Sequence, residues 1–405
     1  MNYALTNSDP RFLPLVTELT DLGQSASDVA ALVEGFNNKL VALGVPIDRT
    51  SLHLGTLHSE RIGTGRLWRP QQPIEETHFG FGTRTDPLFL NSPVHAAEAS
   101  EQPVEIWPQM EGQPDFNIVP DLKAEQITQY IMYPLVLSDG SINAASFATK
   151  AEGGFDPRDR ALLESLLPLY TRVLEIKNLR RTIEEILKIY VGREPGAQIL
   201  SGNTRRGQVS RISAAMLLGD LRHFTDLSNR LPERKLVKVL NAFFDCLVPP
   251  IVDQGGEVLK FIGDAVLAIF PQSDGMAQIS SPRERALNAA RQGLENLRVL
   301  NATLTEDPAI LEAGIALHLG RVAYGNVGAV ERLDFTAIGP DVNLVARLAS
   351  LCSELEQPIL LSERFAKGMN LPLKDLGPHR LKGFAQRQRV FIMENSQDLL
   401  PVEVA

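Results

Sequence analysis

Apolar residues recur along this chain in two spacings, which divide it into helical and strand-forming regions. From Ser25 to Gly44 they recur every three or four residues, which predicts an amphipathic helix. Short β-rich runs at Thr50–Leu57, Gly63–Trp68 and Thr77–Gly82 predict strands. The stretch Thr85–Leu122 contains several prolines, so we expect it to be loop-rich.

A hairpin and a long helix are predicted next. The β-rich runs Tyr130–Leu137 and Ser141–Thr149 flank a Ser-Asp-Gly turn, which is typical of a hairpin. Pro157 is predicted to open the helix, with Asp156 as its N-cap. Pro168 lies inside the same apolar pattern and predicts a kink or a break there.

This helix carries an apolar seam with heptad-like steps and one irregular join, which corresponds to a stammer. Two interpretations are open. The seam could form a parallel coiled coil between two copies of the chain, or one amphipathic helix could pack on its own domain. The number of heptads favours the coiled coil. The seam residues are Leu162, Leu166, Leu169, Val173, Ile176, Leu179, Ile183, Ile186 and Tyr190.

The helix is predicted to end at Tyr190–Pro195, and a polar, basic connector at 201–211 leads to a second set of elements from Ile212 onward. Their order is strand, helix, hairpin, helix, strand, which indicates a ferredoxin-like α+β core with extensions. The expected elements are a strand at Ser213–Gly219, a helix from Phe224 that continues past Pro232, a hairpin at 256–270, a helix at 282–302, a strand at Ala313–Leu319, a glycine-rich turn at Gly325–Gly328, a strand at Leu333–Ile338 and a helix from Gly339.

Composition narrows the function classes. The 405 residues allow two or three domains, and a net charge of −9 argues against a partner bound through a basic surface, such as nucleic acid. Only Cys246 and Cys352 are present, so there is no disulfide framework. We expect a cytoplasmic protein without a membrane partner, because no apolar run has the length of a membrane span and the polar start is not a signal peptide.

Charged residues in the apolar hairpin at 256–270 carry the first chemical signal. Lys260 and Asp264 interrupt a β-rich segment, and burial of either charge is costly without a partner or a metal. Asp220 follows directly after a predicted strand. Each aspartate alone is typical of a turn or a cap. Together they offer the hard oxygen ligands that Mg²⁺ or Mn²⁺ prefer.

Four segments in this order resemble the catalytic domain of class III nucleotidyl cyclases, over residues 212–395. They are Asp220-Leu221-Arg222-His223-Phe224-Thr225, Gly256–Phe270, Phe335–Leu348 and Leu381-Lys382-Gly383. The resemblance implies a palm-type fold and an enzyme that is a phosphorus–oxygen lyase. It also implies two divalent cations per site (Mg²⁺ or Mn²⁺), held by Asp220, Asp264 and the carbonyl of Leu221. Free N–H groups at Phe224 and Thr225 would contact phosphate oxygens.

The resemblance assigns the reaction chemistry to one face of a helix. Asn343 and Arg347 are four residues apart, so they share a face, and the family uses them to orient the ribose and to stabilise phosphate charge. A solvated helix face is the alternative reading. Lys382 and Arg332 would bind the outgoing pyrophosphate, although surface cations would look the same.

Base selectivity is implied by Lys260 and Thr336. The lysine resembles the adenine reader of the family, whereas guanylate cyclases usually carry an acidic residue there, and a threonine hydroxyl both donates and accepts. The implied activity is therefore adenylate cyclase, with ATP as substrate. Guanylate cyclase and a catalytically weak nucleotide-binding dimer are the alternatives. The Lys–Thr pair also resembles a subgroup that often responds to bicarbonate; equal activity with and without bicarbonate at fixed pH would exclude that response here.

The resemblance has one departure and one consequence for assembly. His223 stands where the family usually has glycine, which lets the backbone approach phosphate closely.

In the family, one protomer supplies the metal ligands of a site. The other protomer supplies the base-reading residues, the asparagine and the arginine. The chain holds one copy of each, so the resemblance implies a head-to-tail homodimer with two composite sites.

The N-terminal region, about residues 25–175, resembles a GAF sensor domain through its element order and through Gly154-Phe155, Asp156 and Asp159. An unidentified small molecule is the implied ligand, and a change in the linker helix would transmit its binding to the catalytic domains. His53, His58 and His78 are candidates for metal or haem ligands, or satisfied polar residues. The expected domains are 1–155 (sensor), 156–192 (signalling helix), 193–211 (connector), 212–395 (catalytic) and 396–405 (tail).

Overall fold

The computed structural model describes residues 9–272, 281–304 and 310–394, and the predicted tail 396–405 lies outside these residues. The chain divides into two compact units, Met1–Ile186 and Leu187–Ala405. Among the described residues, no helix has both the length and the apolar character that a membrane crossing requires. Each unit is built around its own sheet.

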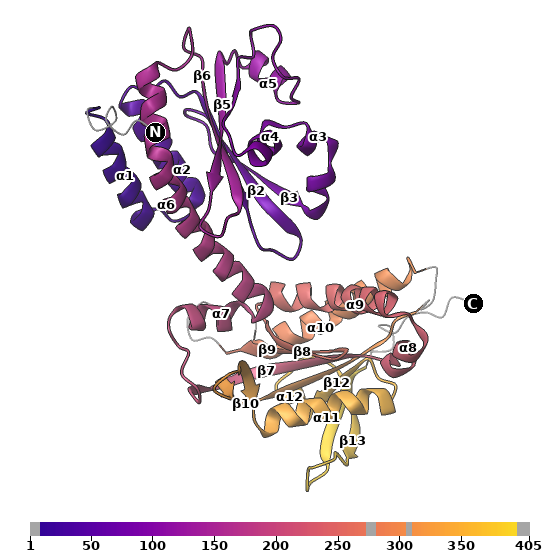
Figure 1. The fold of residues 1–405 in the computed structure, drawn as a ribbon. Helices are drawn as coiled ribbons and strands as arrows, with labels where there is room; N and C mark the ends of the chain where they lie inside the picture. Colours follow the sequence, from indigo (N-terminus) through magenta and orange to yellow (C-terminus); the bar gives the residue numbers. More distant parts are fainter. Residues whose placement is uncertain (1–8, 273–280, 305–309, 395–405) are drawn as a thin grey trace. The chain divides into compact units, whose positions relative to one another are not determined.

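The described part of the N-terminal unit forms a six-stranded antiparallel sheet with the order β3-β2-β1-β6-β5-β4 (Figure 1). The predicted strands and hairpin are confirmed to within a few residues. The strands are β1 (Arg49–Gly55), β2 (Arg61–Trp68), β3 (Glu75–Gly80), β4 (Val104–Ile106), β5 (Gln129–Val136) and β6 (Ile142–Thr149).

Helices cover both faces of this sheet. One face packs on α1 (Phe12–Ser25), α2 (Val29–Ala42) and the first half of α6 (Pro157–Tyr190) around Trp68, Phe36 and Tyr170. The prediction of α2 is confirmed, whereas α1 was not expected. The other face packs on short segments inside the stretch that was expected to be loop, so that expectation was incomplete. These are α3 (Pro87–Leu90), α4 (Pro93–Ser100) and α5 (Val119–Ala124). The short helix η2 (Phe81–Thr85) precedes them and has no buried residue.

Helix α6 corrects two expectations. It begins at Pro157, where the Asp156 carboxylate accepts from the backbone N–H of Arg158 at 2.7 Å, but it continues through Pro168 without a break. The first half of the seam, with Leu162, Leu166 and Val173, is buried in the core of its own unit. The interpretation as a packed amphipathic helix is therefore right for that half. In the second half, the seam residues Ile176, Leu179, Ile183 and Tyr190 are exposed.

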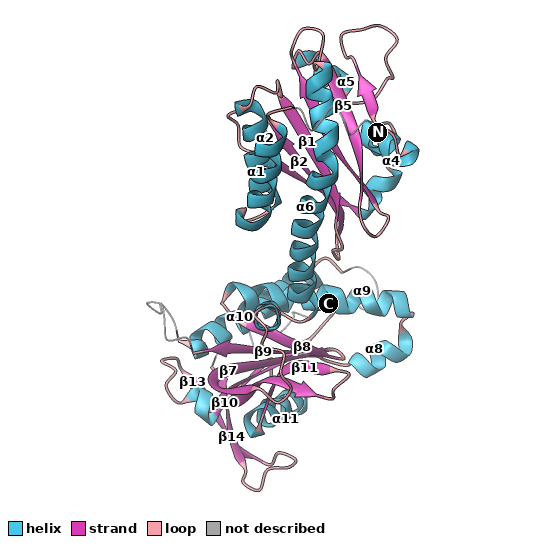
Figure 2. Cartoon of the chain, turned by 60° about the vertical axis from the view of Figure 1, so that its left-hand side comes forward, coloured by secondary structure: helices cyan, strands magenta, loops and turns pink. Residues whose placement is uncertain are grey.

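The described part of the C-terminal unit forms a mixed sheet with the order β13-β14-β12-β10-β7-β9-β8, and β11 pairs with the far half of β10 (Figure 2). The pairs are antiparallel except β10 with β12. The strands are β7 (Val209–Leu221), β8 (Glu257–Ile262), β9 (Ala265–Pro271), β10 (Ala313–Gly328), β11 (Leu333–Ile338), β12 (Ile359–Ser362), β13 (Leu373–His379) and β14 (Gln388–Met393).

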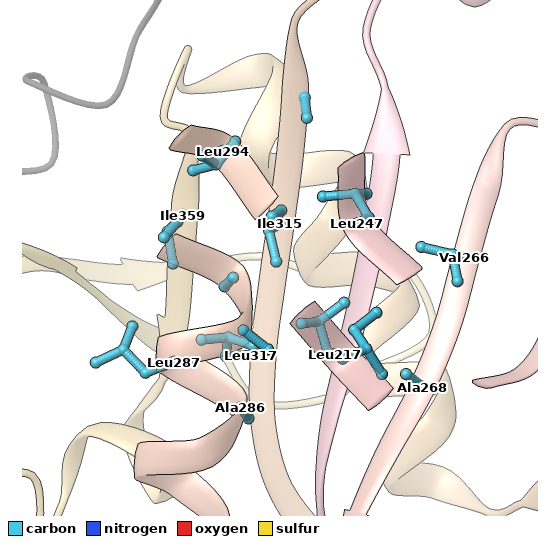
Figure 3. Packing of buried hydrophobic residues seen from close by; sticks show 14 of the residues in the cluster. Leu217, Leu247, Val266, Ala268, Ala286, Leu287, Leu294, Ile315, Leu317 and Ile359 are labelled. Carbon is cyan, nitrogen blue, oxygen red and sulfur yellow. The ribbon is translucent and has the colours of Figure 1, made fainter. Parts of the chain in front are cut away.

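Two helical layers sandwich this sheet. Alternate residues of β7 face opposite sides, so Leu217 packs under α9 and α10 (Figure 3), whereas Met216 and Leu218 face α11. This alternation continues to the end of β7 and fixes the direction of Asp220. The helices are α7 (Arg193–Leu200), α8 (Phe224–Arg230), α9 (Glu233–Asp253), α10 (Pro282–Asn301), α11 (Pro340–Glu354) and α12 (Glu363–Ala366).

Three expectations about this unit are wrong in detail. The helix from Phe224 does not pass Pro232, because Leu231 is extended (φ −90°, ψ 143°), as residues before proline usually are, and α9 starts afresh. Gly325–Gly328 is not a turn but part of β10, and a Cβ on Gly325 would collide with the carbonyl of Gln208. The expected connector contains α7 at its start.

Candidate active site

The two aspartates singled out from the sequence lie next to each other. Asp220 is the penultimate residue of β7 and pairs in register with Ala265, so the β8–β9 turn places Asp264 beside it. Gly263 supplies the positive φ of 64° that the turn requires. A continuous strand and a tight hairpin therefore bring together carboxylates that are 44 residues apart.

The electrostatics of this pair fit a divalent cation. Burial, together with the hydrogen-bond and Coulomb effects of Asp264, raises the pKa of Asp220 to about 7. Two carboxylates that share a site cannot both ionise without cost, and a cation removes that cost. Within the described ranges no cluster of three or more His, Cys, Asp or Glu side chains could hold a metal. A divalent cation bound here would draw further ligands from other oxygens, such as the backbone carbonyl of Leu221 or the phosphates of a substrate.

The turn after β7 explains why glycine suits the position of His223. His223 adopts a left-handed conformation (φ 58°) as the N-cap of α8, and its side chain makes no capping hydrogen bond. The first N–H groups of a helix lack intrahelical partners, so the N–H groups of Phe224 and Thr225 are available to an anion. Helix α8 is short, with seven residues, and Thr225 is exposed.

The β10–β11 ribbon brings a carboxylate to Lys260 that sequence reasoning missed. The Lys260 Nζ donates to Asp334 Oδ2 at 2.7 Å. Asp334 lies two residues before Thr336 on β11, so the two side chains share a face of the strand. Thr336 is 5% exposed, and its Oγ1 is buried without a hydrogen-bond partner among the described residues. The i, i+2 spacing of Asp334 and Thr336 was the available signal.

Asn343 and Arg347 lie on the exposed side of α11, opposite to the buried Leu344, Val345 and Leu348. Neither polar side chain has a hydrogen-bond or ion-pair partner within 9–272, 281–304 and 310–394. The expected shared face is therefore present, and the two donors point into solvent.

The length of helix α11 separates Asn343 from the aspartates. Gly314, the register partner of Asp220, lies against Cys352 near the C-terminal end of the helix, whereas Gly320 lies against Asp341 in its first turn. At 1.5 Å per residue, Asn343 is roughly 14 Å along the helix from Cys352. Because it also faces away from the sheet, one protomer does not bring Asn343 to the acid pair.

The remaining predicted contacts are surface residues on loops. Lys382 is exposed in the β13–β14 loop, where residues 380–385 line a surface hollow. Arg332 is exposed in the β10–β11 turn. In the part of the chain that the structure describes, neither Lys382 nor Arg332 has an interaction with another of the predicted site residues.

In the N-terminal unit, the three candidate histidines have separate environments. The ring of His53 contacts Ser51 Oγ at 3.2 Å, and burial lowers the pKa of His53 to about 4. His58 accepts from the backbone N–H of Glu60. His78 lies 3.8 Å from Glu76. The structure does not bring the three together.

Comparison with known proteins gives a family match for the C-terminal unit. Residues 209–395 match the family model described as the adenylate and guanylate cyclase catalytic domain. An adenylate cyclase of Dictyostelium discoideum, "terminal-differentiation specific", is 32% identical over 163 residues, which is 40% of this chain and 7% of that protein. An uncharacterised protein of Mycobacterium bovis is 32% identical over 199 residues, which is 49% of this chain and 33% of that protein.

The chain thus spans a third or less of the length of these two relatives. Among solved structures, the adenylyl cyclase CyaB from P. aeruginosa is 27% identical and covers 48% of this chain and 99% of that chain, with a TM-score of 0.40. Residues 209–395, which include the adjacent aspartates at the end of β7, are therefore similar to the catalytic domain of adenylate and guanylate cyclases.

Proposed function

We propose that the protein is an adenylate cyclase that converts ATP to 3′,5′-cyclic AMP and pyrophosphate in sites shared between two protomers. One observation carries the proposal. Each chain presents an acid pair near the C-terminal end of α11 and, on the exposed side of its N-terminal half, the unpartnered Asn343 and Arg347. A second copy in the opposite orientation would place its Asn343 and Arg347 beside the acid pair of the first chain. The acid pair of the second copy would in turn meet Asn343 and Arg347 of the first.

The reaction needs few covalent steps from the protein. The ribose 3′-hydroxyl oxygen bonds to the α-phosphorus, the bond from that phosphorus to the α,β-bridging oxygen breaks, and the hydroxyl loses its proton. Asp220, Asp264 and the Leu221 carbonyl would hold two divalent cations, which supply charge neutralisation and a lower hydroxyl pKa. Asn343 orients the ribose, the Arg347 guanidinium stabilises the charge on the α-phosphate, and Lys382, with Arg332, binds the leaving pyrophosphate.

The surroundings of Lys260 and Thr336 favour adenine. The edge of adenine combines an amino donor with ring nitrogen acceptors. The Lys260 ammonium uses one donor on Asp334 and has two more for a ring nitrogen, and the orphaned Thr336 Oγ1 accepts from the amino group. Binding of the base would thus satisfy a buried hydroxyl that otherwise has no partner.

An exposed apolar surface supports the homodimer. Phe261 and Ile262, beside the Asp264 turn, are 52% and 51% exposed, and Phe261 packs against Phe244 of α9 in a tilted arrangement with ring centroids 4.5 Å apart. Val237 on the same helix is 54% exposed. Large exposed apolar side chains next to a candidate site are typical of an interaction surface.

A product assay tests the activity. Purified full-length chain with Mn²⁺ and either ATP or GTP should form cyclic AMP in clear excess over cyclic GMP. Predominant cyclic GMP would instead establish a guanylate cyclase. Nucleotide binding without any cyclic product would establish the nucleotide-binding dimer.

We infer that the N-terminal unit is a GAF-like sensor for an unidentified small molecule. Its antiparallel sheet with helices on both faces supports this reading. The exposed second half of the α6 seam would pair with the same helix of another copy and transmit the signal. Removal of residues 1–190 should change the specific activity or weaken dimerisation; unchanged values of both would contradict this regulation.

A further inference from the structure

Arg222 is a buried guanidinium at the end of the strand that carries Asp220. Its Nη2 donates to the carbonyls of Gln357 at 2.7 Å and Cys352 at 3.3 Å, and its Nη1 pairs with Glu312 Oε2 at 3.3 Å. Only 8% of the side chain is exposed. Two segments distant in sequence, Glu312 and the end of α11 at 352–357, therefore contact one side chain two residues from a candidate metal ligand.

These contacts lie at the C-terminal end of α11. Cys352 is in the last turn of that helix and is fully buried, and cations are favourable at helix C-termini. The helix is also close to the sheet here, because a Cβ on Gly314 would lie 2.8 Å from the Cβ of Cys352. Since Gly314 pairs with Asp220, this contact between α11 and the sheet lies beside the strand position that carries Asp220.

We infer that Arg222 is a positioning residue that couples the two catalytic halves of one protomer. It fastens the strand end that carries Asp220 to the helix that carries Asn343 and Arg347. This inference rests on the proposed composite site. If that site is correct, the two halves joined by one Arg222 belong to different active sites of the dimer, so each Arg222 acts on both.

The chemistry of the side chain suits this task. A planar guanidinium can donate to several acceptors at fixed angles, whereas a lysine ammonium on the same strand end is a point charge that cannot span the three. Loss of the hydrogen bonds from the guanidinium frees the C-terminal end of α11 from the strand end. Because a helix is stiff along its axis, a shift at Cys352 also moves Asn343 and Arg347.

A dimer with a single working site tests the coupling. One chain carries Asn343→Ala and keeps its carboxylates, and the other carries Asp264→Ala and keeps Asn343. Two affinity tags isolate the mixed dimer, whose one complete site takes its acid pair from the first chain. Arg222→Lys is then placed in the second chain only, where the neighbouring acid pair is already inactive.

We expect kcat for cyclic AMP to fall about tenfold, as small displacements of catalytic groups often cause, with little change in the Mn²⁺ concentration for half-saturation. The same substitution in the first chain should also raise that Mn²⁺ concentration. Glu312→Gln in the second chain is a gentler variant, because it weakens only the ion pair between Arg222 and the partly exposed Glu312. It should therefore give a smaller loss of kcat.

Arg285→Lys is the matched control. Its guanidinium also donates to backbone carbonyls, those of Pro271, Gln254 and Gly255, but at the end of the β8–β9 hairpin opposite to Asp264. It should leave kcat unchanged in either chain. If Arg222→Lys and Glu312→Gln in the second chain both leave kcat within about twofold, the coupling is wrong while the composite site stands. If the unsubstituted mixed dimer is itself inactive, the composite site fails, and the coupling fails with it.

Discussion

The acid pair, Asp220 and Asp264, and the exposed donors of α11, Asn343 and Arg347, differ in how far their side chains are held in place before a nucleotide binds. Asp220 and Asp264 already lie together, and burial, together with the hydrogen-bond and Coulomb effects of Asp264, raises the pKa of Asp220 to about 7. Asn343 and Arg347 extend into solvent without partners in the described structure. The first half is held in place before its ligand arrives, whereas the second must lose side-chain freedom on binding. In the proposed shared site, each half supplies what the other lacks.

The largest effect is expected at the acid pair. Asp264→Ala should reduce cyclic AMP formation by about 1,000-fold or more, because it removes one of the two carboxylates proposed to hold the cations that neutralise phosphate charge. The unfolding temperature should not fall, since the substitution removes repulsion. Glu295→Ala, on the exposed surface of α10, removes an acid from an ion pair with Arg298 and should leave activity unchanged. Turnover by Asp264→Ala close to that of the unaltered chain would show that the metal assignment is wrong.

A smaller loss is expected on the other half. Asn343→Ala should lower kcat by about 100-fold while leaving the Mn²⁺ concentration for half-saturation unchanged, because the side chain is proposed to contact the ribose and not the cations. Steady-state kinetics at several Mn²⁺ concentrations separate the two parameters. A shift in Mn²⁺ dependence larger than the loss of kcat would place Asn343 in the acid half and break the division between the two halves.

The raised pKa of Asp220 predicts how pH affects cation binding. Below about pH 7 the pair retains a proton that a cation must displace, so the Kd for Mn²⁺ should rise roughly tenfold from pH 8 to pH 6. Calorimetry in buffers of different ionisation enthalpy should detect the released proton. A Kd that does not change with pH would contradict the close approach of the two carboxylates.

The same shift affects the stability of the metal-free protein. The folded pKa lies above the unfolded value of 3.8, so proton uptake stabilises the fold at low pH, and this contribution is lost as the pH rises through about 7. Asp264→Asn in EDTA should therefore raise the unfolding temperature at pH 8 and change it little at pH 5. A larger gain at pH 5 than at pH 8 would reverse the sign and refute the account.

The smallest effect concerns the base. Thr336→Val removes a buried hydroxyl that has no hydrogen-bond partner among the described residues, so the unfolding temperature should stay equal or rise slightly, while KM for ATP increases about three- to tenfold. Ser362→Ala is the contrasting control, because Ser362 Oγ is buried but bonded to His318 at 2.7 Å and caps α12. That substitution should lower stability. An unchanged KM for Thr336→Val would remove this residue from base recognition.

Local signals predicted much of the fold. The glycines before β8 and in the β8–β9 turn fixed the expected hairpin, and Pro157 and Pro340 marked the first residues of α6 and α11. Each of these features depends on a few neighbouring residues. The adjacency of Asp220 and Asp264 followed only from the family resemblance, and the structure confirms that they lie together. Their roles, and those of Asn343 and Arg347, stay predictions.

Features that depend on distant residues could not be predicted in the same way. The partner of Lys260 lies 74 residues away on β11, where only the spacing of Asp334 and Thr336 gave a signal, and the side-chain contacts of Arg222 lie 90 to 135 residues away, where no local spacing indicates them. The α6 seam shows the same limit. Leu162 and Leu179 repeat the same pattern, yet one is buried in a core and the other is exposed, because only tertiary packing distinguishes the two halves.

The most direct measurement of the shared site is the activity of two inactive chains combined. Asp264→Ala and Asn343→Ala homodimers should each be nearly inactive. After dissociation and equal mixing, half of the dimers should be mixed and each should contain one complete site, so cyclic AMP formation should recover to about one quarter of the unaltered level. Recovery to that level supports a site built from two chains. No recovery, with mixed dimers shown to be present, would contradict it.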